Sequence, residues 1–229
     1  MKQSQLPKCW SVKSVRATDF RAYQERHADA TKLRWISALA ARLKEIEVGS
    51  FVLPRLLPQM ADIREVVPYA LTIPGLHVAV LVPNLRGAQG AFKAGVHKLT
   101  LPVSVTNEHA MANIRKTTAQ LIDEVREIVA LRNAQFPGAQ IEAGVSVVFD
   151  CTIAGAVIED QTMRMCLAMA ECGVDEIGLS DHQRLCESGA GATHVLPPAG
   201  GSGARRAARI FTTRAARASR TWSPRSMWA

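Results

Sequence analysis

The chain has 229 residues, a length that suits one large domain or two small ones. Hydrophobic residues make up 48% of it and aromatic residues 5%, a composition typical of α/β proteins built on small aliphatic side chains. No apolar run approaches the roughly 18 residues of a membrane span, so we expect no membrane partner. The N-terminus lacks an apolar signal-peptide core, and the five cysteines show no Cys-x-x-Cys spacing. These features predict a cytoplasmic protein with reduced thiols.

The net charge of +8 is concentrated in one segment. Residues 182–229 contain eight arginines and one acidic residue, a net charge of +7 that leaves +1 for the rest of the chain. A basic protein would indicate binding to nucleic acid. Here the charge belongs to a tail with few aromatic residues to stack on bases, so we expect no nucleic-acid partner, and binding through the tail stays an alternative.

Helices and strands are expected to alternate over residues 31–181. The hydrophobic periodicity predicts helices at residues 31–43, 59–71, 86–94, 107–136 and 160–172. It predicts buried strands at residues 46–52, 76–82, 98–105, 140–149 and 174–179. This order indicates βαβ units in a parallel sheet, and the spacing favours a (β/α)₈ barrel over a doubly wound sheet, because no Gly-x-Gly-x-x-Gly opens a helix.

The prediction is therefore an incomplete (β/α)₈ TIM barrel with about five recognisable βα units. Residues 1–30 show no clear hydrophobic period and are predicted to form an irregular N-terminal segment. Residues 31–181 form the partial barrel domain. Residues 182–229 form an arginine-rich tail that we expect to be disordered.

Polar residues follow the predicted strands, where barrel enzymes carry out their chemistry. The sequence places six of them there: Ser50, Asn84, Ser104, Asp150, Cys151 and Asp181. Glu47 lies within a predicted strand that would be covered on both sides, so its carboxylate requires a reason to be there. The alternative for Glu47 is a glutamate near a strand end that reaches water.

Four segments carry a resemblance to a known family. IEVGSFV with PQMAD, PNLRG, Asn113 after the next strand, and EIGLSD together resemble hydroxymethylglutaryl-CoA lyase over roughly residues 33–181. The resemblance implies a (β/α)₈ barrel, an acyl-CoA substrate, a Mg²⁺ or Mn²⁺ ion and homo-oligomers among intact relatives. The implied reaction, a step of leucine degradation, cleaves 3-hydroxy-3-methylglutaryl-CoA to acetyl-CoA and acetoacetate. A base removes the tertiary hydroxyl proton in this reaction, and the leaving enolate is reprotonated.

The resemblance also implies roles for four residues. Glu47 matches the family's glutamate on the second strand, and Asp181 matches the aspartate that closes the sixth, so both are expected to be catalytic. Asn84 and Cys151 match positions expected to contact substrate. The loop after Cys151 departs from the family, because it reads Cys-Thr-Ile-Ala-Gly in place of Cys-Pro-aromatic-Glu-Gly.

The family's metal-binding motifs are missing from this chain. The family has Arg-Asp-Gly after its first strand and His-x-His on its seventh, but the chain has no Arg-Asp pair and no histidines at that spacing. We therefore predict no metal ligands in this chain and no lyase activity for it. A relative with another acyl-CoA or hydroxy-acid substrate is the alternative within the same class.

A change of reading frame at both ends would account for the missing motifs. With suitable synonymous codons, the code for Val12–Arg21 reads EVGPRDGFQ in another frame, and that for Arg209–Ala229 reads a string containing His-Phe-His. Residues 182–188 similarly read TNGYANP, a continuation of the sixth strand. The hypothesis is a frameshifted lyase gene, through sequencing error or as a pseudogene; a genuine basic tail is the alternative.

Overall fold

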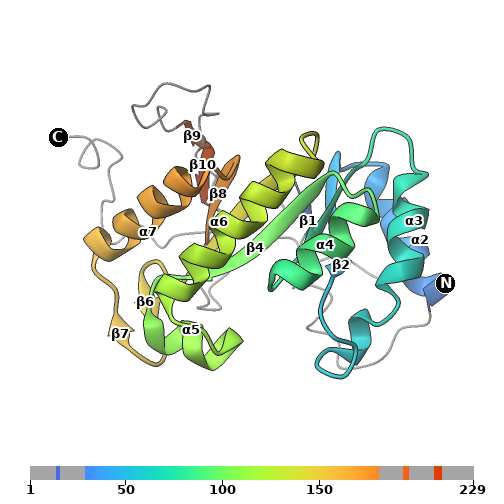
Figure 1. Ribbon diagram of the computed structural model, residues 1–229. Helices are drawn as coiled ribbons and strands as arrows, with labels where there is room; N and C mark the ends of the chain where they lie inside the picture. Colours follow the sequence, from blue (N-terminus) through green and yellow to red (C-terminus); the bar gives the residue numbers. More distant parts are fainter. Residues whose placement is uncertain (1–13, 16–28, 181–192, 196–208, 213–229) are drawn as a thin grey trace.

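The computed structural model describes residues 14–15, 29–180, 193–195 and 209–212, and contains one large sheet (Figure 1). Its strand order is β1-β2-β3-β4-β5-β8-β10-β9, and all neighbours are parallel except β10 and β9. The strands of this sheet are β1 (Ser14–Val15), β2 (Glu45–Ser50), β3 (His77–Leu81), β4 (Lys98–Ser104), β5 (Gln140–Ser146), β8 (Glu176–Ser180), β9 (Thr193–Val195) and β10 (Arg209–Thr212). A separate hairpin joins β6 (Asp150–Cys151) to β7 (Gly155–Ala156).

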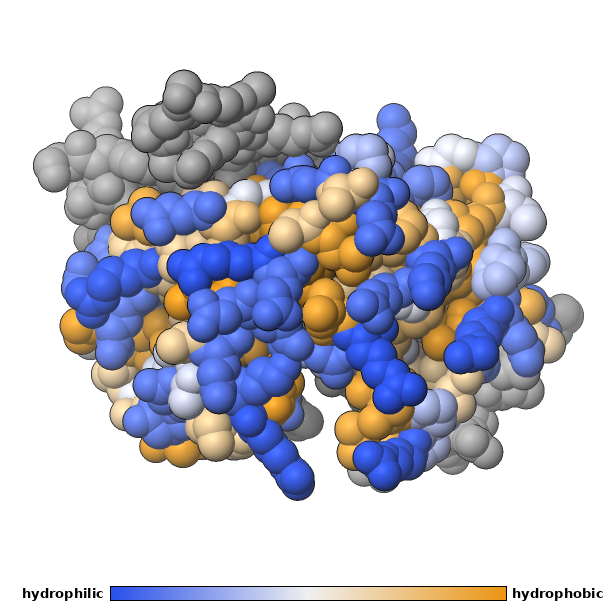
Figure 2. All heavy atoms as spheres, viewed as in Figure 1, coloured by the Kyte–Doolittle hydropathy of each residue, from blue (hydrophilic) through white to orange (hydrophobic). Residues whose placement is uncertain are grey.

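Helices connect the central strands and cover one side of the sheet (Figure 1). They are α2 (Asp29–Ala40), α3 (Ile63–Leu71), α4 (Leu85–Lys93), α5 (Asn107–Ile114), α6 (Thr118–Gln135) and α7 (Glu159–Cys172), with a 3₁₀ turn η1 (Pro58–Met60) before α3. Hydrophilic side chains predominate on the outer surface of these helices (Figure 2). Within the described ranges no helix is long and apolar enough to cross a membrane. The predicted α/β fold with five central parallel strands is confirmed.

The two faces of the sheet differ in chemistry because side chains alternate along each strand. The helix-facing positions are apolar and form the core, as Val78, Val80 and Leu101 illustrate. The opposite positions carry polar or small residues, such as Lys98 and Glu142. In a barrel that second face is the interior, so the alternation fixes which residues can meet inside.

One predicted helix is divided in two. The sequence predicted a continuous helix over residues 107–136, but α5 ends before Arg115, which has the left-handed φ of 57°. A new helix, α6, then starts after Thr117, whose hydroxyl accepts from the backbone N–H of Gln120 while the Gln120 side chain accepts from the backbone N–H of Thr117. This reciprocal capping box stabilises a fresh helix start and overrides the hydrophobic period that runs through it.

Short strands lie in both terminal segments that were expected to be irregular. Strand β1 pairs with β2, with Ser14 opposite Glu45, and β10 pairs with β8, with Arg209 opposite Glu176. The sequence did not predict either strand, because neither has the apolar alternation of the central five. They extend the five-stranded sheet at its two edges, where the first and seventh strands of a full barrel would lie. The domain boundaries at residues 30 and 181 stay predictions.

Candidate functional site

Glu47 lies in the middle of β2 with its side chain buried. It is 4% exposed and sits opposite Ala79 in the register with β3. Glu45, two residues earlier and therefore on the same side of the strand, reaches Lys98 on the polar face of the sheet. Glu47 consequently lies on the barrel-interior side, and the alternative in which it reaches water is wrong.

A bulge interrupts β2 just beyond Glu47. The register with β3 shifts between Glu47 and Ser50, so that Ser50 rather than Gly49 lies opposite Leu81. Gly49 faces the helices, since a Cβ on it would lie 2.4 Å from Cδ1 of Ile63. An extra residue in a strand redirects the side chains that follow it, so Ser50 shares the interior side with Glu47.

Three serines line up across the carboxyl ends of β4, β5 and β8. Ser104 lies opposite Ser146, and Ser146 lies opposite Ser180. The Ser104 hydroxyl is hydrogen-bonded to Nδ1 of buried His109 at 2.8 Å, whereas the Ser146 hydroxyl donates to the backbone oxygen of Val103 at 3.1 Å. The row forms a polar edge above the barrel interior.

Sequence reasoning identified Ser104 in this edge but missed Ser146 and His109. The fourth predicted strand was expected to run over residues 140–149, whereas β5 ends at Ser146 and Val147 takes a left-handed φ of 56°. The strand end was therefore placed three residues too late. His109 lies on the first turns of α5, and its contact with Ser104 depends on the turn between β4 and that helix.

Asn84 caps helix α4. Its Oδ1 accepts a hydrogen bond of 2.9 Å from the backbone N–H of Gly87. Gly87 is required at that position, because a Cβ there would lie 2.7 Å from the backbone oxygen of Phe51. The side-chain oxygen of Asn84 thus has a structural use at the carboxyl end of β3, and its predicted contact with substrate stays a prediction.

Cys151 is buried in β6 of the β6–β7 hairpin, opposite Gly155. Its Sγ accepts hydrogen bonds from the Thr106 hydroxyl at 3.3 Å and from the backbone N–H of Ala154 at 3.4 Å. Burial raises the pKa of the Cys151 thiol, but the hydrogen bonds from Thr106 and from the backbone of Ala154 and Ile153 outweigh it. The net pKa lies below the ordinary cysteine value, so this thiol is more readily ionised than burial alone would allow.

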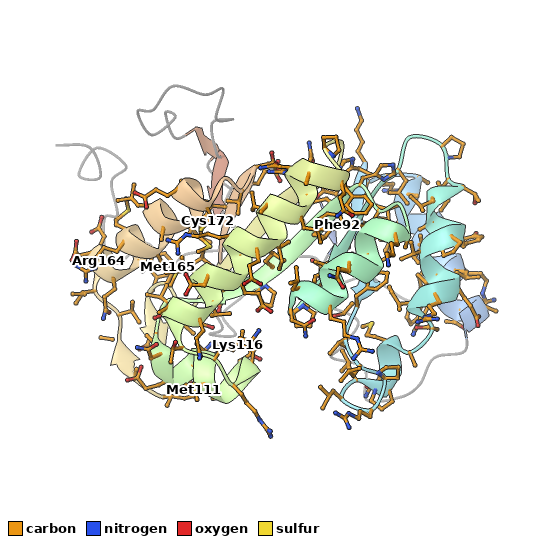
Figure 3. All side chains as sticks on the ribbon, viewed as in Figure 1. Phe92, Met111, Lys116, Arg164, Met165 and Cys172 are labelled. Carbon is orange, nitrogen blue, oxygen red and sulfur yellow. The ribbon has the colours of Figure 1, made fainter. Side chains whose placement is uncertain are left out.

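A cavity of about 510 Å³ adjoins Cys151. Thr106 and Ala154, the two hydrogen-bond donors to its sulfur, both line this cavity. Arg164 and Met165 of α7 line another side of it, and Figure 3 shows both residues on that helix. Glu47, in the middle of β2, and Asn84, at the start of α4, do not line it.

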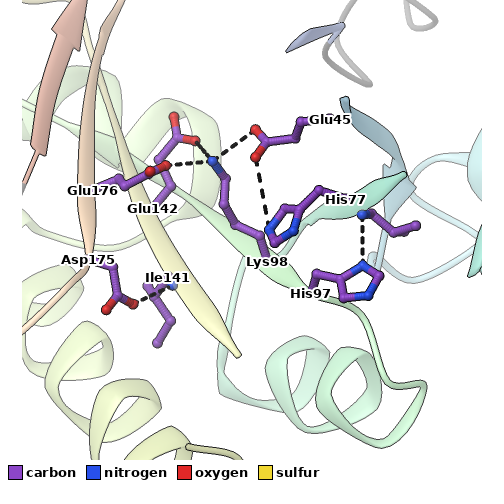
Figure 4. Close-up of polar contacts among 9 residues, drawn as sticks. Glu45, His77, His97, Lys98, Ile141, Glu142, Asp175 and Glu176 are labelled. Atoms are coloured by element: carbon purple, nitrogen blue, oxygen red, sulfur yellow. Dashed lines mark hydrogen bonds and ion pairs between the residues drawn. The ribbon is translucent and has the colours of Figure 1, made fainter. Parts of the chain in front are cut away.

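The amino-terminal ends of the strands hold a buried ion cluster (Figure 4). Lys98 Nζ lies 2.9 Å from Glu45, 3.1 Å from Glu142 and 2.6 Å from Glu176. Burial lowers the pKa of Lys98, but the three carboxylates outweigh it and hold the net pKa above the ordinary value. This end of a barrel serves stability rather than catalysis, and the sequence did not predict the cluster.

The described residues do not provide the family's metal site. Across residues 14–15, 29–180, 193–195 and 209–212, no three His, Cys, Asp or Glu side chains come together so as to hold a metal ion. The carboxylates that do gather in the interior surround Lys98 instead. Asp181, predicted to be catalytic, lies outside the described residues, directly after Ser180.

Comparison with known proteins finds relatives that cover about two thirds of the chain. No family model matches it. Hydroxymethylglutaryl-CoA lyase YngG of Bacillus subtilis is 30% identical over 155 residues, covering 67% of this chain and 51% of that protein. The 3-hydroxy-3-isohexenylglutaryl-CoA/hydroxymethylglutaryl-CoA lyase of Pseudomonas aeruginosa is 31% identical over 168 residues, covering 73% of this chain and 55% of the relative. The chain spans about half the length of these curated relatives.

Solved structures agree. The HMG-CoA lyase of Acinetobacter baumannii, in complex with coenzyme A and 3-methylmalate, superposes with a TM-score of 0.67 and 26% identity, over 72% of this chain and 55% of that one. The Bacillus subtilis HMG-CoA lyase superposes with a TM-score of 0.67 and 27% sequence identity, over 72% of this chain and 57% of that one.

The parallel sheet, its helix-covered apolar face and its polar carboxyl-terminal edge define a protein of the TIM-barrel class. Within that class the chain is hydroxymethylglutaryl-CoA lyase-like, as the matches over two thirds of its length show. The resemblance first read from IEVGSFV, PQMAD and PNLRG is thereby confirmed.

Proposed function

We propose that the described region is the acyl-CoA-binding part of a carbon–carbon lyase that acts on 3-hydroxy-3-methylglutaryl-CoA. The observation that carries this proposal is the buried carboxylate of Glu47 on the interior side of β2, at the position that matches the lyase glutamate. The related lyase that binds coenzyme A and 3-methylmalate supports an acyl-CoA thioester as the ligand.

Glu47 and Asp181 are the proposed catalytic residues. A carboxylate held on the interior side can accept the proton of the tertiary hydroxyl, whose oxygen becomes the ketone oxygen of acetoacetate as the carbon–carbon bond breaks. The protonated acid can return a proton to the enolate carbon of acetyl-CoA. Asn84 and Cys151 are the proposed substrate contacts from two other parts of the carboxyl-terminal edge. A cytoplasmic location stays a prediction, since the curated relatives include mitochondrial lyases such as that of Arabidopsis thaliana.

The 229-residue chain is proposed to bind its ligand without turning it over. The family resemblance implies Mg²⁺ or Mn²⁺, and the described residues do not fit such an ion. The proposed cause is the shifted reading frame at both ends, which would remove Arg-Asp-Gly and His-x-His.

The test compares two proteins. The chain as given and a frame-restored chain are incubated with 3-hydroxy-3-methylglutaryl-CoA and Mg²⁺ or Mn²⁺, and acetyl-CoA and acetoacetate are measured. We expect product only from the restored chain, and Glu47→Gln in that chain should lower kcat by about 100-fold or more, the usual contribution of an acid–base residue. Turnover by the chain as given would contradict the proposed loss of activity.

A second substrate is favoured by one comparison. The Pseudomonas aeruginosa relative is named for 3-hydroxy-3-isohexenylglutaryl-CoA as well as for hydroxymethylglutaryl-CoA. The isohexenyl thioester belongs in the same assay, because a larger 3-substituent would change kcat/KM without changing the bond that is cleaved. A higher kcat/KM for the isohexenyl thioester would make it the proposed substrate in place of 3-hydroxy-3-methylglutaryl-CoA, and the class of reaction would be unchanged.

A further inference from the structure

Two histidine rings stack at the amino-terminal end of the sheet, where β3 and β4 begin (Figure 4). The ring centroids of His77 and His97 lie 5.0 Å apart, and the ring planes differ by 24°. His77 is the first residue of β3, and His97 directly precedes β4. The pair lies at the opposite end of these strands from the carboxyl-terminal edge, so its role is separate from the proposed lyase chemistry.

His97 extends the pairing of β3 with β4 by one residue through its side chain. The strand register starts with Ala79 opposite Lys98. One residue earlier, Nδ1 of His97 accepts a hydrogen bond of 2.9 Å from the backbone N–H of Val78, and the backbone N–H of His97 donates to the oxygen of Val78 at 3.0 Å. Val78 is 0% exposed, so loss of the imidazole acceptor would leave a buried N–H unpaired.

The hydrogen bond from Val78 requires a neutral ring at His97. A ring nitrogen that accepts a hydrogen bond carries no proton, so the single proton of His97 lies on Nε2. An imidazolium has an N–H at both nitrogens and cannot accept. Protonation at Nδ1 therefore breaks the bond and sets two donors against each other. Histidine changes charge between about pH 5 and 8, so mild acid supplies the necessary proton.

The surroundings of the pair also resist a positive charge. Burial lowers the pKa of His77, and His97 and Lys98 lower it further. Glu45, whose Oε2 lies 4.0 Å from Nε2 of His77, and a hydrogen bond with Gln140 oppose this shift without reversing it. The charged groups beside the pair are Glu45 from β2 and Lys98 from β4, and Lys98 in turn holds Glu142 from β5 and Glu176 from β8.

We propose that the stacked histidines form an acid-sensitive latch between β3 and β4, which is closed by the hydrogen bond from Val78 to His97 and opens when His97 is protonated. The folded-state pKa of His77 lies below its unfolded value of 6.5, so the unfolded chain binds more protons once the pH falls below that value. Stability is therefore fully present above pH 6.5 and is lost as the pH falls through the folded-state pKa. Opening loosens the end of the sheet that serves stability in a barrel.

Two substitutions of His97 separate the proton from the hydrogen bond. His97→Asn keeps an acceptor, because Oδ1 of asparagine is bonded to Cγ as Nδ1 of histidine is, and this oxygen takes up no proton in the same pH range. His97→Phe keeps a ring against His77 and removes the acceptor. Each variant is thus the matched control of the other. The melting temperatures of the full chain and both variants are measured at pH 7.5 and at pH 5.0.

The latch predicts a different order of stability at each pH. At pH 7.5 the parent and His97→Asn should melt within about 2 °C of each other, and His97→Phe should melt about 3–6 °C lower, the shift for one lost buried hydrogen bond. At pH 5.0 the parent should melt together with His97→Phe, because it has lost the same bond. His97→Asn should then melt about 3–6 °C above both.

Two results would overturn the latch. A difference between the parent and His97→Asn that is the same at both pH values would mean that acid leaves the bond to Val78 intact. Equal melting of the parent and His97→Phe at pH 7.5 would mean that the bond contributes nothing to stability. If His97→Asn fails to fold, the comparison with His97→Phe still decides, because its difference from the parent must close at pH 5.0.

Discussion

Lys98 Nζ lies 2.6 Å from Glu176 Oε2 and so connects β4 to β8 across the intervening strand β5. Glu142, on β5 itself, and Glu45, on β2, approach the same nitrogen from two further strands. One ammonium group therefore joins four of the five central strands at the amino-terminal end of the sheet. The strand register creates this meeting, since Lys98 pairs with Ala79 on one side and Gln140 on the other.

Lys98→Met is expected to lower the free energy of unfolding by about 3 kcal/mol, because it leaves three carboxylates together without their cation. Urea unfolding followed by circular dichroism measures the change. Arg126→Met is the control: Arg126 pairs with Asp123 on the exposed face of α6, and its loss should cost less than about 1 kcal/mol. Equal effects of the two substitutions would contradict a stabilising role for the buried cluster.

The same cluster predicts a pH dependence. The folded-state pKa of Lys98 is raised above its unfolded value of 10.5. The contribution of Lys98 to the free energy of unfolding is therefore fully present below pH 10.5. It is lost as the pH rises through the folded-state pKa, when the unfolded lysine is already neutral. The difference in unfolding free energy between the parent and Lys98→Met should thus stay constant from neutral pH to about 10 and shrink only above it. Shrinkage near neutral pH would contradict the assigned direction of the shift.

The packing of Gly49 against α3 can be tested by a double substitution. Gly49→Ala places a methyl group 2.4 Å from Cδ1 of Ile63 and should cost about 1–3 kcal/mol, the range for an overfilled core. Ile63→Val removes that Cδ1 atom, so the double variant should recover much of the loss. The coupling free energy comes from urea unfolding of all four proteins. Gly138→Ala, where no atom lies within 4 Å, is the control and should be nearly neutral.

The five central strands could be predicted because each has a short apolar run bounded by turn residues. Contacts that depend on the register between strands could not be predicted from the sequence. Lys98 and Glu176 are 78 residues apart in the sequence, and nothing local indicates that they touch. The position of Ser50 on the interior side depends on a one-residue bulge in β2 that hydrophobic alternation does not reveal.

The break between α5 and α6 was predictable in principle. Thr117 and Gln120 have the spacing of a capping box, but the hydrophobic period continued through them and was given more weight. The strand pattern singled out Glu47, the family resemblance matched it to a catalytic glutamate, and the structure shows it buried on the interior side. The strand pattern placed Asp181 at a strand end, and only the resemblance gave it a catalytic role.

The capping box gives a direct test of that break. Thr117→Ala should lower the free energy of unfolding by about 1 kcal/mol, because the backbone N–H of Gln120 loses its acceptor. Thr152→Ala, at an exposed turn position, is the control and should change stability by less than about 0.5 kcal/mol. If Thr117→Ala were equally neutral, the start of α6 would owe its position to tertiary packing instead.

Cys151 and Cys166 are each 1% exposed, but Cys166 lies deeper in the protein, so burial acts more strongly on its thiol. Hydrogen bonds outweigh burial and lower the pKa of Cys151, whereas burial alone raises the pKa of Cys166 to about 12. Because the thiolate is the reactive form, iodoacetamide at pH 7.5 should alkylate Cys151 at least tenfold faster, as measured by peptide mass spectrometry. Thr106→Val removes one hydrogen-bond donor to the Cys151 sulfur. It should slow alkylation of Cys151 several-fold without changing the alkylation rate of Cys166. Equal rates at the two cysteines would mean that access, rather than ionisation, limits the reaction.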